Sequence, residues 1–327
     1  MNIDVHNHFA PQEYINLLLR QKGFPSMERR DGGYLINVHP SDSYVISEGM
    51  HRAETRLSDM EAAGVDLEVV SPIVPAGEVA KDPGLNLELA KAANEGIARL
   101  AKEHPTRFVG MATLPLLTPH EAVRELDRAV TQLGLSSVML TSNVAGRTLD
   151  SPDLWPVYER AEQLGVPLMI HPSWPIMTEH LQGWTLAVNL GFLFDSSAAM
   201  MRIILSGVME QYPKLTFILC HLGSVIPYVI GRLNRRGGPR TGQWGVNDRP
   251  PFDYFKRVYV DTVSRHRPAI LCARATLGVD RLMFGTDYPY GPIPPMMADI
   301  LELEIPQHEK DAVMGGNAQS LFGIRTG

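Results

Sequence analysis

The chain has 327 residues, of which 44% are hydrophobic and 20% charged, and its formal net charge is −6. This length fits two average domains or one large α/β barrel, and the composition is that of a globular protein with ample core material. The acidic balance argues against a general nucleic-acid binder, although "GRLNRRGGPR" (231–240) is a local basic exception. We expect neither a membrane helix nor a signal peptide. The only two cysteines, Cys220 and Cys272, favour a reducing compartment, so a cytoplasmic protein is expected.

Short apolar runs rich in Val, Ile and Leu recur along the chain and have the character of buried parallel strands. There are eight of them, at 2–6, 67–73, 108–114, 137–142, 167–172, 216–222, 258–263 and 282–287.

Segments with helical spacing lie between most of these runs. The clearest are 86–104, 118–134, 151–165 and 196–213. In 118–134 a Thr-Pro start suits a helix N-terminus and Gly134 supplies the stop. Strand alternating with helix eight times predicts a single (β/α)8 TIM barrel over residues 1–327, with "GNAQSLFGI" (316–324) as a short closing helix.

One segment, at about 20–56, does not fit the repeat. Two alternating runs around a Pro-Ser-Asp turn in "GGYLINVHPSDSYVIS" (32–47) predict a small β-hairpin. We interpret the segment as an insertion near the barrel mouth and not as a separate domain.

Polar, metal-competent residues end four of the predicted strands. They are His6 and His8 on the first strand, His171 on the fifth, His221 on the sixth and Asp287 on the eighth. In a barrel these ends meet at the face where such enzymes keep their active sites. Residues at i and i+2 of a strand face the same side, so His6 and His8 can approach one metal together. With His171 and Asp287 they would leave a position open, as in catalytic zinc sites.

Each of these residues has an ordinary explanation when it is taken alone. A histidine at a strand end is often a surface or hydrogen-bonded residue, and Asp287 in "GTDYPYG" suits an Asx turn. Core packing gives no reason for four apolar strands to end this way together, so we predict a metal site. The remaining histidines are expected to be solvated or substrate-facing: His39, His51, His104, His120, His180, His266 and His308.

The ordered motifs resemble the amidohydrolase superfamily, specifically the decarboxylase branch typified by α-amino-β-carboxymuconate-ε-semialdehyde decarboxylase. The resemblance covers nearly the whole chain. Its motifs are "DVHNHF" (4–9), "EAAGVDLEVVSP" (61–72), "HPSW" (171–174), "IILSGVMEQYPKL" (203–215), "CHLGS" (220–224), "GRLNRR" (231–236), "GTDYPY" (285–290) and "GNAQSLF" (316–322).

The resemblance implies that His6, His8, His171 and Asp287 bind one divalent metal, zinc first and manganese as the alternative. It places His221 beside them, at the metal-bound water, as a catalytic residue together with Asp287; direct ligation by His221 stays open. A metal lowers the pKa of bound water to about 7, and a nearby imidazole can take or return its proton.

The resemblance also suggests substrate contacts. Arg232 matches an arginine that reaches a neighbouring subunit's site and grips a carboxylate, which requires at least a homodimer; a solvated basic run is the alternative. Trp184 and Tyr290 are candidate pocket aromatics that ordinary packing would also explain. "HLGS" (221–224) departs from the family's "HGGG", and no arginine aligns cleanly with the one that binds a second substrate carboxylate, Arg52 and Arg30 being nearest.

We therefore expect a non-oxidative decarboxylase of an unsaturated or aromatic carboxylate. The alternative keeps the site but uses a metal-bound hydroxide to hydrolyse or hydrate a cyclic or unsaturated carbonyl compound. A barrel with a structural metal and a partner-binding surface is a third reading, against which the open ligand set argues.

Overall fold

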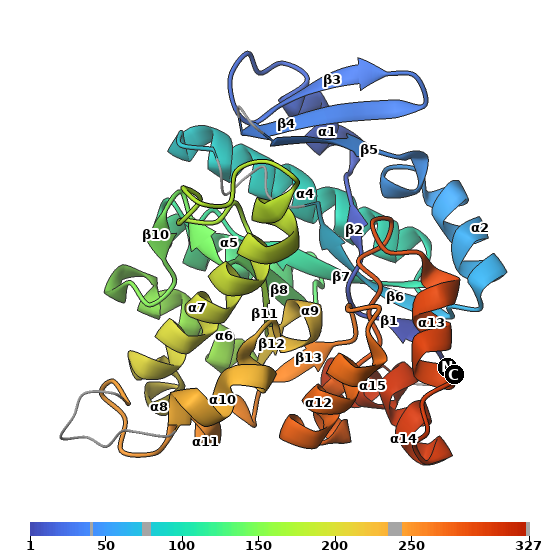
Figure 1. The fold of residues 1–327 in the computed structure, drawn as a ribbon. Coiled ribbons are helices and arrows are strands. Elements are labelled where there is room, and N and C mark those ends of the chain that lie inside the picture. Colours follow the sequence, from blue (N-terminus) through green and yellow to red (C-terminus); the bar gives the residue numbers. More distant parts are fainter. Residues whose placement is uncertain (40–41, 74–79, 235–243, 325–327) are drawn as a thin grey trace.

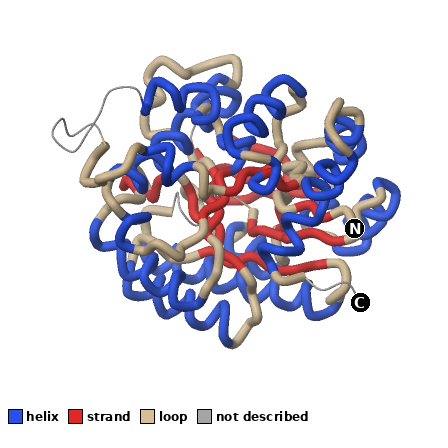
Figure 2. Tube along the Cα trace, turned by 90° about the horizontal axis from the view of Figure 1, so that it is seen from below, coloured by secondary structure: helices blue, strands red, loops and turns tan. Residues whose placement is uncertain are grey.

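A parallel sheet curves around a common centre and is ringed by helices (Figures 1 and 2). The computed structural model describes residues 1–39, 42–73, 80–234 and 244–324. In spatial order the strands are β1 (Ile3–Asp4), β6 (Leu67–Pro72), β7 (Phe108–Thr113), β8 (Ser137–Thr141), β11 (Leu168–His171), β12 (Phe217–Leu219), β13 (Tyr259–Asp261) and β14 (Leu282–Met283). A short strand, β2 (His8–Phe9), continues the first strand and also pairs with β6.

The barrel closes where the first strand meets the last. The Val5 amide donates to the Phe284 carbonyl at 3.0 Å, and the His8 amide donates to the Tyr288 carbonyl at 2.9 Å. Asn7 and Tyr288 form a parallel bridge in the same seam. The predicted (β/α)8 barrel is confirmed, with each of the eight predicted runs contributing a strand.

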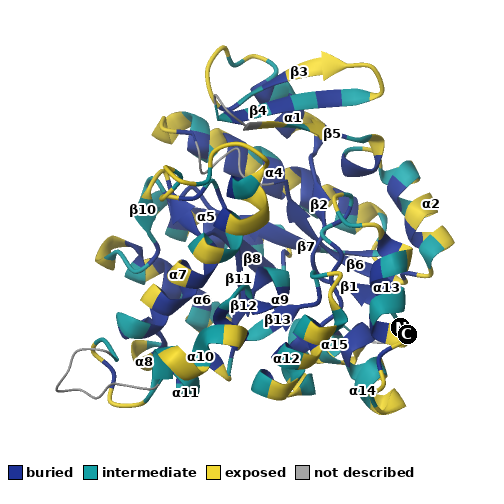
Figure 3. Ribbon diagram, in the orientation of Figure 1, coloured by how far each residue is buried: buried dark blue, intermediate teal, exposed yellow. Residues whose placement is uncertain are grey.

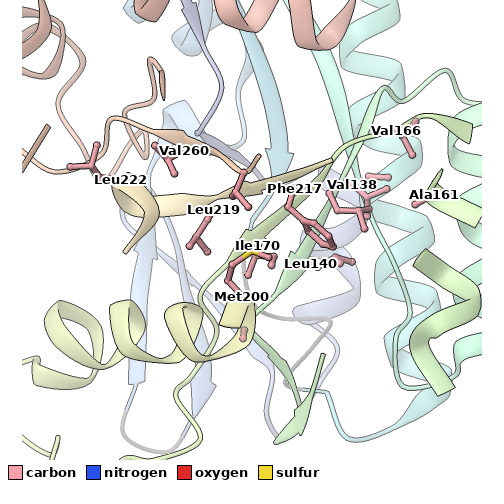
Figure 4. Packing of buried hydrophobic residues seen from close by; sticks show 14 of the residues in the cluster. Val138, Leu140, Ala161, Val166, Ile170, Met200, Phe217, Leu219, Leu222 and Val260 are labelled. Atoms are coloured by element: carbon pink, nitrogen blue, oxygen red, sulfur yellow. The ribbon is translucent and has the colours of Figure 1, made fainter. Parts of the chain in front are cut away.

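Side chains alternate across the barrel wall, as strand geometry requires. Met139, Met169 and Ile218 fill the barrel interior together with Ile3, while their chain neighbours face the helices. Figure 4 shows that outer layer, in which residues such as Leu140, Ile170 and Phe217 pack against helical side chains. Figure 3 shows the same division, with the barrel strands buried inside and exposed positions on the outer helix faces, the loops and strand β3 of the insertion.

Helices cover the outside of the barrel, apart from α9 (Cys220–Gly223), a four-residue turn that directly follows β12. The helices are α1 (Gln12–Leu18), α2 (Ala53–Ala63), α4 (Pro83–Glu103), α5 (Pro119–Thr131), α6 (Trp155–Leu164), α7 (Phe192–Leu205), α8 (Val208–Gln211), α9, α10 (Ile226–Asn234), α11 (Pro251–Phe255), α12 (Arg267–Leu277), α13 (Ile293–Leu301), α14 (Gln307–Asp311) and α15 (Asn317–Phe322). The predicted helix 196–213 is two helices, because Gly207 adopts φ +88° between α7 and α8. The closing helix is α15.

The helical stretch Ala187–Leu205 qualifies the expectation that no apolar segment is long enough for a membrane helix. By length and composition it passes that test, and 44% of it is buried inside the fold. Met200, Ile203 and Ile204 of α7 belong to the core between helices and strands. The buried face of the stretch therefore packs against the barrel.

The insertion forms a three-stranded antiparallel sheet, one strand more than the predicted hairpin. Its strands are β3 (Ser26–Arg30), β4 (Gly33–His39) and β5 (Asp42–Ile46), with β4 in the middle. Residues 40 and 41 of the predicted turn lie outside the described residues. Alternate positions of β4 are buried, and Ile36 packs with Tyr14 of α1 and Leu89 of α4. The sheet thus sits over α1 and α4 at one end of the molecule, as Figure 1 shows.

Two further strands and several short turns complete the chain. The strands β9 (Asn143–Val144) and β10 (Arg147–Thr148) form a small antiparallel pair after β8. The turns are of the 3-10 type in η1 (Glu48–Met50), η2 (Pro152–Leu154) and η5 (Val279–Arg281), whereas η3 (Ala187–Gly191) and η6 (Ala312–Gly316) are short π-helices.

Candidate metal centre

The five residues predicted from the strand ends meet at one face of the barrel. One potential ligand atom from each of His6, His171, His221 and Asp287 lies within 4.8 Å of those of the other three. The His8 Nε2 atom joins this group, because it is 2.9 Å from Asp287 Oδ1. The barrel has therefore brought together residues that are up to 281 positions apart in the chain.

Three of the imidazoles are held by their Nδ1 atoms. His6 Nδ1 lies 2.6 Å from Asp261 Oδ2, and His171 Nδ1 lies 2.8 Å from the Pro172 carbonyl oxygen. His8 Nδ1 contacts the Ser71 hydroxyl at 3.0 Å and the Pro72 carbonyl oxygen at 3.3 Å. A carbonyl or carboxylate can only accept, so Nδ1 carries the proton and Nε2 keeps the lone pair that a metal needs.

Three buried imidazole nitrogen atoms of these residues lack hydrogen-bond partners among the described residues. The Nε2 atoms of His6 and His171 and the Nδ1 atom of His221 are buried and make no hydrogen bond within the described part of the chain. Buried polar atoms in that state are costly unless something occupies the space between them. A divalent cation bound by imidazole nitrogens and a carboxylate oxygen fits this donor set.

The charges of the centre are strongly coupled. Burial raises the pKa of a carboxyl group, but the imidazoles of His6, His221 and His8 hold the pKa of Asp287 well below its usual range. Burial and the neighbouring imidazoles hold the pKa of His171 well below its usual range. Burial also opposes protonation of His6, yet the acidic groups around it, Asp261 and Asp287 among them, raise its pKa well above the ordinary value. Asp287 is therefore ionised and His171 neutral, and these are the forms of the two side chains that can bind a metal ion.

A cavity of about 600 Å³ opens above these residues. His8, His171, His221 and Asp287 line its base. The walls are mainly aromatic and aliphatic and include Tyr44, Trp174, Val188, Phe192, Leu193, Val263 and Tyr290. The predicted pocket residue Tyr290 is thus in place, with its ring centroid 6.0 Å from that of His8.

The other predicted substrate contacts do not line this cavity. Trp184 is 89% exposed, in the loop between β11 and α7, where its backbone adopts φ +48°. Arg232 is exposed near the end of α10, and Arg52 is exposed just before α2. Arg30 forms a surface ion pair with Glu28 at 3.1 Å. Their roles toward a substrate stay predictions, and within a single chain these side chains face outward.

Comparison with known proteins identifies the family. The Amidohydrolase family model matches residues 3–324. The chain belongs to the amidohydrolase family. The resemblance drawn from the motifs is thereby confirmed.

Three similar proteins show where this amidohydrolase lies within the family. It is 28% identical to the 2-amino-3-carboxymuconate-6-semialdehyde decarboxylase of Dictyostelium discoideum, over 99% of this chain and 92% of that protein. The crystal structure of 5-carboxyvanillate decarboxylase from Sphingomonas paucimobilis superposes with a TM-score of 0.88 at 26% identity, covering 99% of both chains. The dihydroxybenzoic acid decarboxylase from Polaromonas sp. has manganese and the inhibitor 2-nitroresorcinol bound; its TM-score is 0.82 at 25% identity, covering 100% of this chain and 98% of that chain.

Asp261 of the amidohydrolase is a site residue that the sequence reasoning missed. Its carboxylate contacts the His6 ring and also accepts the backbone amides of His221 at 3.0 Å and Leu222 at 2.9 Å. These contacts support a turn in which His221 adopts φ +53°, a left-handed conformation that is uncommon for residues other than glycine. The available signal was a lone acidic residue inside the apolar run 258–263.

Two further buried groups hold the first strand in place, and neither was predicted. Asp4 accepts the His6 amide at 3.0 Å and the Thr286 amide at 3.1 Å, which ties the first strand to the chain just before Asp287. Arg56 of α2 is fully buried; it donates to the His8 carbonyl at 2.7 Å and pairs with Glu68 at 2.5 Å. These contacts therefore fix the backbone on both sides of the candidate ligands His6 and His8.

Proposed function

We propose that this amidohydrolase removes CO₂ from an aromatic or unsaturated carboxylate by a metal-dependent, non-oxidative reaction. The observation that carries the proposal is the cavity itself, in which His221 and Asp287 lie beside unpartnered ligand nitrogens at the base of largely apolar walls. The decarboxylases that resemble this chain support the same reaction.

We assign the metal ligands to His6, His8, His171 and Asp287. Zinc is the ion we propose, with manganese, which the Polaromonas relative binds, as the alternative. When bound, the cation would hold the substrate carboxylate and fix its position relative to the proton donor.

His221 and Asp287 are the proposed proton-handling pair. His221 Nε2 lies 3.6 Å from Asp287 Oδ2, and both side chains face the cavity. A proton from this pair is added to the carbon that bears the carboxylate, using an electron pair of the ring or double bond. The bond to the carboxylate then breaks, its electron pair restores the ring or double bond, and CO₂ leaves. The net reaction consumes one proton and no water.

The apolar walls have a role in this chemistry. Phe192, Leu193 and Val263 surround the space above the proton-handling pair and offer few groups that could hold water there. A flat ring packs against such side chains, which orients the carbon atom toward the base of the cavity. Loss of CO₂ from a charged carboxylate is favoured in such a water-poor site.

We also propose a homodimer in the cytoplasm, with Arg232 serving the partner's cavity. Tyr228 and Arg232 are four positions apart on α10 and share one face of it; Tyr228 is 87% exposed. Trp184 and Met177 are exposed apolar side chains on the loop before α7. Among the described residues the cavity lining contains no lysine or arginine, so a second copy would supply the positively charged side chain that pairs with a substrate carboxylate.

Two other features bear on the compartment and on the number of domains. Unpaired Cys220 and Cys272 suit the cytoplasm. The barrel seam between the two ends of the chain supports a single domain.

The decisive experiment measures CO₂ release from a panel of hydroxybenzoates and unsaturated carboxylates by the metal-loaded enzyme. Runs in D₂O and in H₂¹⁸O separate the alternatives. A decarboxylase places deuterium on the carbon that lost CO₂ and no ¹⁸O in the organic product, whereas a hydrolase or hydratase places ¹⁸O there. The His221→Asn variant should lose turnover while keeping its metal. Product labelled with ¹⁸O and no CO₂ would contradict the proposal.

A further inference from the structure

A second cavity of about 600 Å³ lies beside the first. Phe24, Val38 and Ile176 give it apolar walls, and Lys81, Asn143 and Thr178 add polar groups. Trp174 lines both cavities, and the chain turns between them at 172–175. The indole therefore separates the space above the metal centre from a neighbouring space of equal size.

The indole is stacked against an imidazole of the insertion. The rings of Trp174 and His39 lie 4.7 Å apart between centroids, with an angle of 14° between their planes. His39 ends β4 and lines only the second cavity, whereas Tyr44 of the adjacent strand β5 lines the first. The small sheet thus contributes one side chain to each space and supports the wall between them.

The backbone on both sides of Trp174 is pinned by hydrogen bonds. Asn143 Nδ2 donates to the Trp174 carbonyl at 2.9 Å and to Asp195 Oδ2 at 2.9 Å. The other Asp195 oxygen accepts the Ile176 amide at 3.0 Å, and the Ser142 hydroxyl also donates to Asp195. A turn anchored to α7 in this way holds the indole at a fixed place.

We propose that Trp174 is the residue that limits substrate length, closing the cavity above the metal centre against the second one. The inference rests on the proposed function, since it concerns the substrate of that same site. With the indole in place, a ring substituent that points toward the second cavity meets Trp174 and cannot extend further. Without it the two spaces join, and an aromatic carboxylate with an additional ring fits, because the second cavity offers Phe24, Val38 and Ile176 to a phenyl group.

The test compares the binding of 2-hydroxybenzoate and of its 4-phenyl and 5-phenyl derivatives by calorimetry with metal-loaded protein. The native enzyme should prefer the single ring. In Trp174→Ala the ratio of dissociation constants should move toward a phenyl derivative by about tenfold or more, in line with what pocket size usually contributes to selectivity. CO₂ release from the same compounds should show the same change in preference.

Matched variants make the result specific. Ile176→Ala enlarges only the second cavity and should leave the preference unchanged. His39→Ala removes the stacking partner and should move the preference in the same direction as Trp174→Ala, by less. An unchanged ratio in folded Trp174→Ala overturns the inference; if that variant does not fold, an unchanged ratio in His39→Ala does. Absence of CO₂ release from every carboxylate by the native enzyme would instead count against the proposed function.

Discussion

The base of the cavity and its mouth are built in opposite ways. At the base, His6, His8 and His171 are between 0 and 6% exposed. Each is held by a hydrogen bond that its Nδ1 atom donates. At the mouth, the cavity-lining side chains Val188 and Tyr290 are 40% and 48% exposed. The base is finished within one chain, whereas the mouth presents side chains that this chain alone leaves in solvent.

The difference separates two kinds of function. Ligand positions fixed by barrel strands and buried partners are preorganised, which is what metal affinity and proton transfer require. Loop and helix residues at the mouth govern which molecules enter and how tightly they are held. Substitutions at the base should therefore act on the metal and on turnover, and substitutions at the mouth on substrate binding.

The largest effect is expected for His6→Ala. Without this proposed ligand the protein should no longer bind one metal ion per chain. Turnover should fall by about 10³-fold or more, since the metal supplies several kcal/mol of transition-state stabilisation. Metal analysis and CO₂ release measure both. Circular dichroism should match that of the metal-free native protein, and a variant that retains full metal and activity would show that the base is not the metal centre.

An intermediate effect is expected for Asp261→Asn. The amide keeps the size of the side chain but removes the charge that orients the His6 ring, and such outer partners contribute about 10–100-fold to metal affinity. Competition with a chelator measures this affinity. Asp299→Asn, at a surface ion pair with Arg265, is the control and should bind metal normally. Equal affinities in the two variants would mean that the hydrogen bonds at the base do not contribute to metal binding.

The smallest effect is expected for Arg232→Ala, at the exposed residue that we propose serves the partner's cavity. Removal of a guanidinium that meets a substrate carboxylate should raise KM by roughly 10-fold, about 1.4 kcal/mol, with metal content unchanged. Arg124→Ala on α5, an arginine that is 73% exposed, is the matched control. Sedimentation of the native enzyme should show a dimer. An unchanged KM in Arg232→Ala, or a monomer, would remove the partner's cation from the proposal.

The sequence predicted most where strand geometry decides the outcome. His6, His8, His171, His221 and Asp287 could be placed together because parallel strands end at one face of a barrel. Asp261 was missed because its partners, the His6 ring and two amides after β12, are distant in sequence. Trp174 and Tyr44 were missed because a loop and an inserted sheet carry them to the cavity, and no periodic pattern specifies that placement. The additional strand of the insertion, β3, was missed because four of its five residues are polar. The segment therefore lacks the alternation of apolar and polar residues that predicts a strand.

The seam between the first and last strands also sets the time during synthesis at which the metal site can form. His8 and Asp287, which touch across that seam, are 279 residues apart. At about 5–20 residues per second, a ribosome needs roughly 15 to 55 s to make the chain between them. During that time the first histidines are made but their carboxylate partner is not. Metal loading is therefore a late event in the life of each molecule, and a chain that stops before β14 carries four of the five residues without a centre.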